Sequence, residues 1–143
     1  MAAGHQHHLE YGGSAVSTEF DGSLQFELLA RVPHISVSHE FTELTARQIR
    51  YALVATVGPE RPYYHRYYDV ILDVRMISGW QPGAGAFVDA LHARMHRIGG
   101  ELYLVATVPT PVTSDVPTFT TVEAALAQAR ANRAERRLAT LQD

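Results

Sequence analysis

The chain contains no cysteine among its 143 residues. This absence excludes disulfides, thiolate metal sites and thiol nucleophiles, and it suits a reducing compartment, so we expect a cytoplasmic protein. Long apolar runs are also absent, and none approaches the roughly 20 residues that span a bilayer. The first residues lack the apolar core of a secretory signal peptide. We therefore expect no membrane insertion.

An excess of charge of one sign is lacking too, with 12 Lys and Arg against 15 Asp and Glu and a formal net charge of -3. Such a balance argues against a general nucleic-acid binder. The sequence has no glycine-rich nucleotide loop of accepted form, no Ser-His-Asp order and no paired-carboxylate motif. These absences predict a protein that is not an enzyme and needs no cofactor.

What is present is enough apolar material, 46% of the residues, for one domain with its own core. The strongest pattern runs from Tyr68 to Ala106. Two short apolar runs there, Val70–Leu72 and Leu102–Val105, are typical of strands buried on both faces. The amphipathic helix between them predicts a right-handed crossover that joins two parallel strands. We expect residues Arg75–Gly83 to form the loop before this helix, where open α/β sheets bind their ligands.

The flanking segments complete an α/β pattern. Asp21-Gly22 predicts a β-hairpin, and His34–His39 alternates with the period of a strand. Thr42 is the expected N-cap of an amphipathic helix that ends near Gly58-Pro59. Its predicted buried side comprises Leu44, Ile49, Ala52, Leu53 and Val57.

Towards the C-terminal end, Phe119 predicts a short edge strand, and Thr120 with Glu123 predicts a capping box that opens a last helix. The whole pattern predicts an α/β sandwich whose mixed sheet begins with an antiparallel hairpin, continues with parallel strands and carries helices packed on it. We expect a flexible segment at residues 1–17, one domain at 18–130, and a helix end with a basic tail at 131–143.

Histidines are the candidate metal ligands. His5, His7 and His8 lie in the N-terminal segment, where we expect no fixed geometry. In the second helix, a buried face centred on Phe87 leaves His92 and His96 on the solvent side, at the i, i+4 spacing of a two-histidine site. The buried face is predicted to include Leu91, Met95 and Ile98. Asp89 is predicted to lie on the solvent side with the histidines, where it could orient His92 or pair with it. Since no third ligand is evident, we expect a solvated face without a metal.

Several local motifs have a familiar order. Residues Val37–Ala46 occupy the place of a "V-x-G-E-L-D-x-x-T-A" motif, and Val70–Val74 matches "V-x-L-D-L". Gly99–Val105 matches "G-G" followed by "x-L-x-L-V", and Thr121–Leu126 answers "T-x-x-E-A-L". In this order and spacing the chain resembles the STAS domain family, the fold of anti-sigma-factor antagonists, over roughly residues 22–130.

The resemblance implies a protein-interaction module that regulates transcription. In the family, a "D-S-S-G-L-G" loop binds a serine-kinase anti-sigma factor, and phosphate on its serine breaks that contact. With Gly83–Gly85 aligned to this loop, the phosphoacceptor position holds Pro82, which has no hydroxyl, and a strand-ending glycine of the family is His39. Ser78 is the candidate for a displaced acceptor.

The resemblance thus implies a protein partner, with an anti-sigma factor or serine kinase as the candidate class, and homo-oligomers are a further candidate. The residues expected to bind the partner are Glu40, Phe41, Thr42, Ser78, Gly79, Trp80, Gln81, Pro82, Gly83 and Ala84. Trp80 has two open interpretations, an exposed anchor for the partner or a side chain packed over the core.

An alternative function is a small-ligand or nucleotide sensor. Backbone amides near Gly83–Gly85, at the amino terminus of the second helix, could receive an anion or a nucleotide phosphate.

Overall fold

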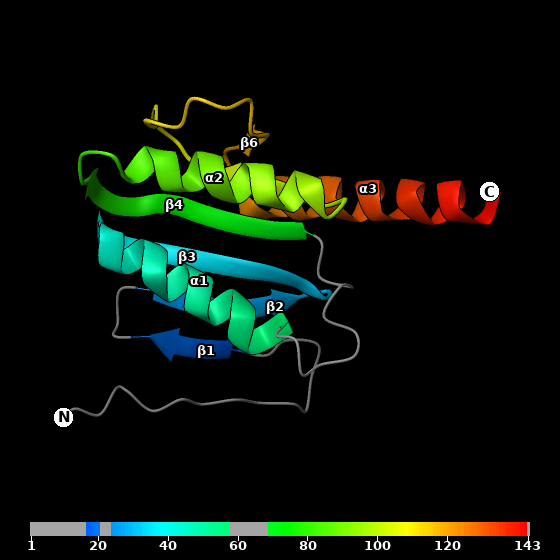
Figure 1. Cartoon of the computed structure of the whole chain (residues 1–143), viewed down its shortest axis with the longest axis horizontal. Helices are drawn as coiled ribbons and strands as arrows, with labels where there is room; N and C mark the ends of the chain where they lie inside the picture. Colours follow the sequence, from blue (N-terminus) through cyan, green and yellow to red (C-terminus); the bar gives the residue numbers. More distant parts are fainter. Residues whose placement is uncertain (1–16, 21–23, 58–68, 143) are drawn as a thin grey trace.

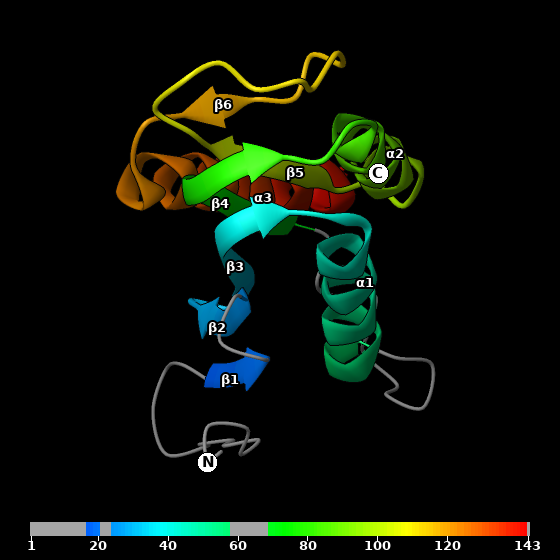
Figure 2. The same ribbon diagram turned by 90° about the vertical axis from the view of Figure 1, so that its left-hand side faces the viewer.

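The computed structural model describes residues 17–20, 24–57 and 69–142. The elements, which Figures 1 and 2 label between them, are in chain order β1 (Ser17–Phe20), β2 (Leu24–Leu29), β3 (Val32–Phe41), α1 (Glu43–Val57), β4 (Asp69–Trp80), α2 (Ala84–Arg97), β5 (Glu101–Val105), β6 (Thr118–Phe119) and α3 (Val122–Gln142). The described strands form one 6-stranded sheet in the order β1-β2-β3-β4-β5-β6. The pairs β1/β2 and β2/β3 are antiparallel, and every later pair is parallel. The predicted mixed sheet, its antiparallel start and the short strand at Phe119 are confirmed.

Helices cover both faces of this sheet. Helices α1 and α2 pack on one face, and α3 lies across the other (Figures 1 and 2). The α1/α2 side is the larger core and includes Ile35, Leu72 and Leu104, whereas Ile71 and Tyr103 face α3. Successive residues of β4 and β5 are therefore buried on opposite sides, which explains their nearly continuous apolar runs.

The central strand β4 is longer than the sequence predicts. Residues 75–80, expected in the loop, continue the strand to Trp80, because the ladder between β3 and β4 extends to the pair of Phe41 with Trp80. Two register shifts absorb extra β4 residues, and at the second shift His39 pairs with Ile77 while Glu40 pairs with Gly79. Ser78 is thus the extra residue of a β-bulge. The prediction of a long loop was wrong, since only residues 81–83 separate β4 from α2.

Helix α1 begins as predicted. The backbone N–H of Thr45 donates to the Thr42 hydroxyl at 3.3 Å, and the N–H of Thr42 donates to the Thr45 hydroxyl at 3.0 Å, so the two threonines cap each other. Ile49 and Ala52 are buried as expected, but Leu44 is 56% exposed because the buried stripe follows Thr45 and Ala46 instead. The side chain of Val57 lies outside the described residues, as do Asp21-Gly22, Gly58-Pro59 and residues 1–16.

The buried face of α2 differs from the prediction by a rotation about the helix axis. Val88, Leu91, His92 and Met95 are buried, whereas Ile98 is 49% exposed. The prediction that His92 faces solvent was wrong. The residues 107–117 pass over the outer side of α2 and give this helix a second packing surface (Figure 1).

Helix α3 begins one residue later than predicted. The N–H of Ala124 donates to the Thr121 hydroxyl at 3.1 Å, so Thr121, and not Thr120, is the N-cap and the predicted capping box does not form. The helix runs without a break to Gln142, through the predicted domain limit at residue 130. The limits of the domain themselves stay a prediction. None of the helices described here has the length and apolar character needed to cross a membrane.

Candidate functional site

The carboxyl ends of β3 and β4 bring the two predicted docking segments together. Glu40 pairs with Gly79 and Phe41 pairs with Trp80 in the parallel ladder. Beyond the strands, the N–H of Gln81 donates to the Phe41 carbonyl at 2.9 Å. The Gln81 side chain then accepts a hydrogen bond from the N–H of Glu43 at 2.8 Å. This glutamine therefore links the start of α1 to the turn before α2.

The turn before α2 has a defined geometry. The N–H of Ala84 donates to the Gln81 carbonyl at 2.9 Å, and Gly83 has φ 85° and ψ -7°. These values, with proline at the second position, define a type II turn, which requires a positive φ at its third residue. The Pro-Gly pair is the sequence signal for this turn. Pro82 lies in the turn and is not the first residue of the helix, which is Ala84.

Trp80 packs against the core. Its ring stacks on Phe41 with a centroid distance of 4.7 Å and an interplanar angle of 19°, and Phe41 is fully buried. Phe87 from α2 approaches the same ring of Phe41 at 6.2 Å. Of the two interpretations of Trp80, the contacts favour the packed side chain. In the turn that follows Trp80, by contrast, Gln81, Pro82 and Gly83 are exposed.

An open groove of about 390 Å³ lies between the first turns of α1 and the start of α2. Arg47 and Arg50 of α1 contribute positive charge to it. Arg47 forms an exposed ion pair with Glu43 at 3.5 Å, and the Arg50 guanidinium lies 5.8 Å from the centroid of the Phe87 ring. The residues lining the groove are Thr42, Glu43, Ala46, Arg47, Arg50, Gln81, Pro82, Gly83, Ala84 and Phe87.

The groove thus contains half of the predicted docking residues, together with two arginines, Arg47 and Arg50, that were not among the predicted residues. Thr42 and Gln81–Ala84 line it, whereas Glu40 and Ser78 are exposed beside it on the strands. The arginines lie one turn apart on α1, but only the fold shows that this turn faces the start of α2.

Gly85 does not belong to the groove. A Cβ atom at this position would lie 2.3 Å from the Pro111 carbonyl oxygen, so the loop after β5 covers the glycine closely. Of the three residues at which an anion site was expected, only Gly83 and Ala84 line the groove.

Asp73 is buried on the other face of the sheet. Arg75 donates to both of its carboxylate oxygens, at 3.0 Å from Nε and 2.8 Å from Nη2. Burial would raise the pKa of Asp73, but the His34 ring, with Nε2 3.9 Å from Oδ2, and the hydrogen bonds from Arg75 outweigh this effect and hold the pKa well below its usual range. The carboxylate is fixed as an ion, which suits a structural role.

Comparison with known proteins identifies the fold. None of the protein-family models matches the chain, and no curated protein matches its sequence. The chain is similar to the solved structure of the anti-sigma factor antagonist SpoIIAA in its unphosphorylated form, with a TM-score of 0.60 and 19% identity over 75% of this chain and 97% of that chain. It is also similar to an anti-sigma factor antagonist from Mycobacterium paratuberculosis, with a TM-score of 0.54 and 18% identity over 81% of this chain and 92% of that chain. The predicted STAS-like α/β fold is confirmed.

Proposed function

We propose that the chain is a non-enzymatic protein-interaction module for regulatory partner switching, comparable to an anti-sigma-factor antagonist and acting in the cytoplasm. Its docking face comprises Glu40–Thr42 and Ser78–Ala84. The observation that carries the proposal is the convergence of these two segments, which Gln81 holds together through Phe41 and Glu43. The likeness in fold to two antagonists supports the same role. The proposed partner is an anti-sigma factor of the serine-kinase class.

In this proposal, phosphorylation at the usual position cannot switch off the docking face. A phosphate would add up to about two negative charges and would reshape a contact surface. Pro82 has no hydroxyl to receive it, and the proline fixes the backbone of the turn. Ser78, exposed on the bulge of β4, is the proposed displaced acceptor. Mass spectrometry of the chain isolated from its own cells tests this assignment.

A charge placed on the turn tests the docking face. Pro82 is exposed and lines the groove, so Pro82→Glu imitates the missing phosphate without opening the core. We expect it to lower affinity for the partner at least tenfold, which corresponds to about 1.4 kcal/mol. The measurement is capture from the native lysate followed by titration with the purified partner.

Ala127→Glu is the matched control, because Ala127 is exposed on α3, on the other side of the sheet. The proposal requires that the wild type and the control capture a serine-kinase anti-sigma factor and that Pro82→Glu does not. Equal capture by all three proteins, with equal melting temperatures, would reject this face as the docking site.

A ligand or nucleotide sensor is the second candidate, and the groove favours it. Arg47 and Arg50 line the groove, and so does the start of α2. The N-cap residue of α2 is Gly83, which has no side-chain oxygen to accept hydrogen bonds from the first backbone amides of the helix. A ligand that binds only the folded chain raises its melting temperature by mass action. A rise with ATP or GTP that Arg47→Gln/Arg50→Gln abolishes would support the sensor. A melting temperature that millimolar nucleotide does not change would reject the sensor, and the interaction module would be the remaining candidate.

A further inference from the structure

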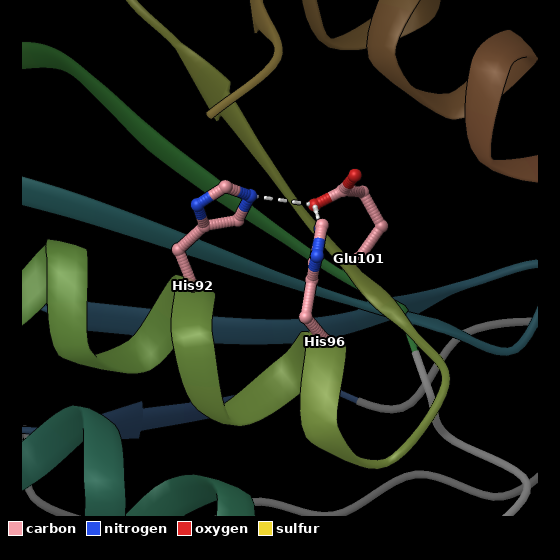
Figure 3. Close-up of side chains that lie close together, drawn as sticks. All are labelled: His92, His96 and Glu101. Carbon is pink, nitrogen blue, oxygen red and sulfur yellow. Dashed lines mark hydrogen bonds and ion pairs between the residues drawn. The ribbon is translucent and has the colours of Figure 1, made fainter. Parts of the chain in front are cut away.

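We propose that His92, His96 and Glu101 form a binding site for a divalent transition-metal ion of the zinc class. The three side chains come from the last two turns of α2 and the first residue of β5, and Figure 3 shows them converging. The site lies at the end of α2 opposite the docking face, about 18 Å along the helix axis from its start to His96. It is independent of the proposed function.

The local chain path creates the cluster. The N–H of Gly100 donates to the Met95 carbonyl at 2.8 Å, and the N–H of Gly99 donates to the His96 carbonyl at 3.0 Å. With Gly99 at φ 86°, these bonds form a Schellman motif, which ends the helix and reverses the chain. Glu101 therefore returns to the turns of α2 that carry the histidines.

The atoms that would bind the metal point towards one another. Nε2 of His92 and Nε2 of His96 each lie 2.9 Å from the same oxygen of Glu101, Oε1. The three ligand atoms all lie within 4.8 Å of one another. Ligands bound to zinc at about 2.0–2.1 Å are separated by roughly 3 Å, so small side-chain movements would place an ion between these atoms.

The first histidine is already oriented. His92 is buried, and its Nδ1 lies 3.2 Å from the Ser114 hydroxyl, which can donate or accept. This bond turns Nε2 towards Glu101, and it persists whether Nε2 carries a proton or a metal. Asp89 holds Ser114 in place, since its Oδ1 accepts the Ser114 N–H at 2.8 Å. Such support behind a histidine ligand is typical of metal sites. Asp89, expected from its spacing either to orient His92 or to pair with it, thus acts on His92 through Ser114.

The side chains also determine the class of ion. Two imidazoles with one carboxylate suit zinc, and Mg²⁺ prefers sites made of oxygen atoms. His96 is the exposed member, with a side chain 55% accessible, so water can complete the coordination from that side. The ion would connect the end of α2 to β5. The histidine pair visible in the sequence lacked a third ligand, and the fold provides it.

The test is calorimetric titration with Zn²⁺ in a background that removes the N-terminal histidines, His5→Ala/His7→Ala/His8→Ala, because these side chains could bind zinc on their own. We expect one Zn²⁺ per chain and a higher melting temperature with Zn²⁺ but not with Mg²⁺. His96→Gln is the decisive variant because the exposed side chain can change without disturbing the core. Loss of a ligand should lower the affinity by more than the roughly 10- to 100-fold that loss of a residue supporting a ligand typically costs.

Two further variants separate binding from folding. Ser114→Ala should lower zinc affinity about tenfold and Ser114→Thr, which keeps the hydroxyl, should restore it. Arg94→Gln, an exposed change on the same helix, should leave zinc binding unchanged. The proposal is overturned if the background protein binds no zinc, if His96→Gln binds it equally well, or if Mg²⁺ binds as tightly as Zn²⁺.

Discussion

At the scale of single residues, His39 occupies a backbone conformation that favours glycine. Its φ is 64°, at the bulge where β3 and β4 change register, and the resemblance to STAS domains places a glycine here. A left-handed conformation costs a non-glycine residue about 1–2 kcal/mol. We expect His39→Gly to raise the free energy of unfolding by about 1 kcal/mol, part of the gain being offset by the flexibility of glycine in the unfolded chain.

Urea denaturation measures this change. The reciprocal variant is Gly83→Ala, at φ 85° with no atom near the new Cβ, so that only backbone strain changes. It should lower the free energy of unfolding by a similar amount. A loss of stability in His39→Gly would mean that the imidazole makes a stabilising contact that outweighs the strain.

Asp89 is the second residue with a measurable effect, in this case on pH dependence. Burial would raise the pKa of Asp89, but hydrogen bonds from Ser114 and Thr113 outweigh this effect and lower the pKa to about 2. A carboxyl with a lowered pKa stabilises the folded state above its ordinary value, and that contribution disappears as the pH falls through the folded value. Asp89 should therefore stabilise the chain at neutral pH and lose this effect between about pH 4 and pH 2.

The comparison is between wild type and Asp89→Asn in urea at several pH values. The wild type should be the more stable protein at pH 6, and the difference should narrow below pH 4. Asp115→Asn, an exposed change in the same loop, serves as the control. A difference between wild type and Asp89→Asn that stays constant down to pH 2 would show that the charge of Asp89 is not what matters.

At the scale of elements, the hairpin between β2 and β3 has an unexpected turn. Leu29 pairs with Val32, so only Ala30 and Arg31 connect the strands, and both have positive φ values of 52° and 70°. A type I′ turn requires this geometry and prefers Asn-Gly. Ala30→Asn/Arg31→Gly should therefore raise the free energy of unfolding by about 1 kcal/mol.

This prediction has an internal check. Arg133 of α3 donates to the backbone carbonyl of Ala30, a bond that does not depend on the side chain of residue 30. The slope of unfolding free energy against urea concentration should stay the same, because the folded contacts are retained. A less stable double variant would show that Ala30 or Arg31 makes a side-chain contribution larger than the strain of the turn.

The same elements show what sequence can predict. Apolar periodicity identified β4, α2 and β5, because burial on one or two faces constrains every residue of those segments. The Ala-Arg turn carries no such signal, since its conformation is imposed by the pairing of β2 with β3. Likewise, the end of β4 follows from the length of β3, and the burial of His92 follows from the loop 107–117 above α2. These three features could not be predicted from local sequence, because each depends on a contact between distant segments.

At the scale of the whole molecule, two side chains of the C-terminal helix α3 bind residues of β4 and β5. Arg136 donates to the buried carboxylate of Asp69, and Asn132 donates to the Tyr103 hydroxyl at 2.7 Å. Removing the partner of a buried charge costs about 1–3 kcal/mol or more. Arg136→Met should lower the free energy of unfolding by about that amount, and Arg136→Met/Asp69→Asn should recover part of it.

Urea denaturation of the single and double variants decides this prediction. Arg137→Met, one position along α3 and exposed, is the matched control and should change stability little. An unaltered midpoint for Arg136→Met would mean that the ion pair between Arg136 and Asp69 contributes little to stability. That result would fit the basic tail expected from the sequence.

The strand order of the sheet copies the order of the chain, and this has a consequence for synthesis on the ribosome. Each strand pairs with the one made just before it, so the newest strand always forms the edge that the next strand will cover. The apolar face that includes Ile71 and Tyr103 has no cover until α3 has emerged. A nascent chain released before that point would contain a paired sheet with one exposed hydrophobic face, the kind of surface that chaperones bind.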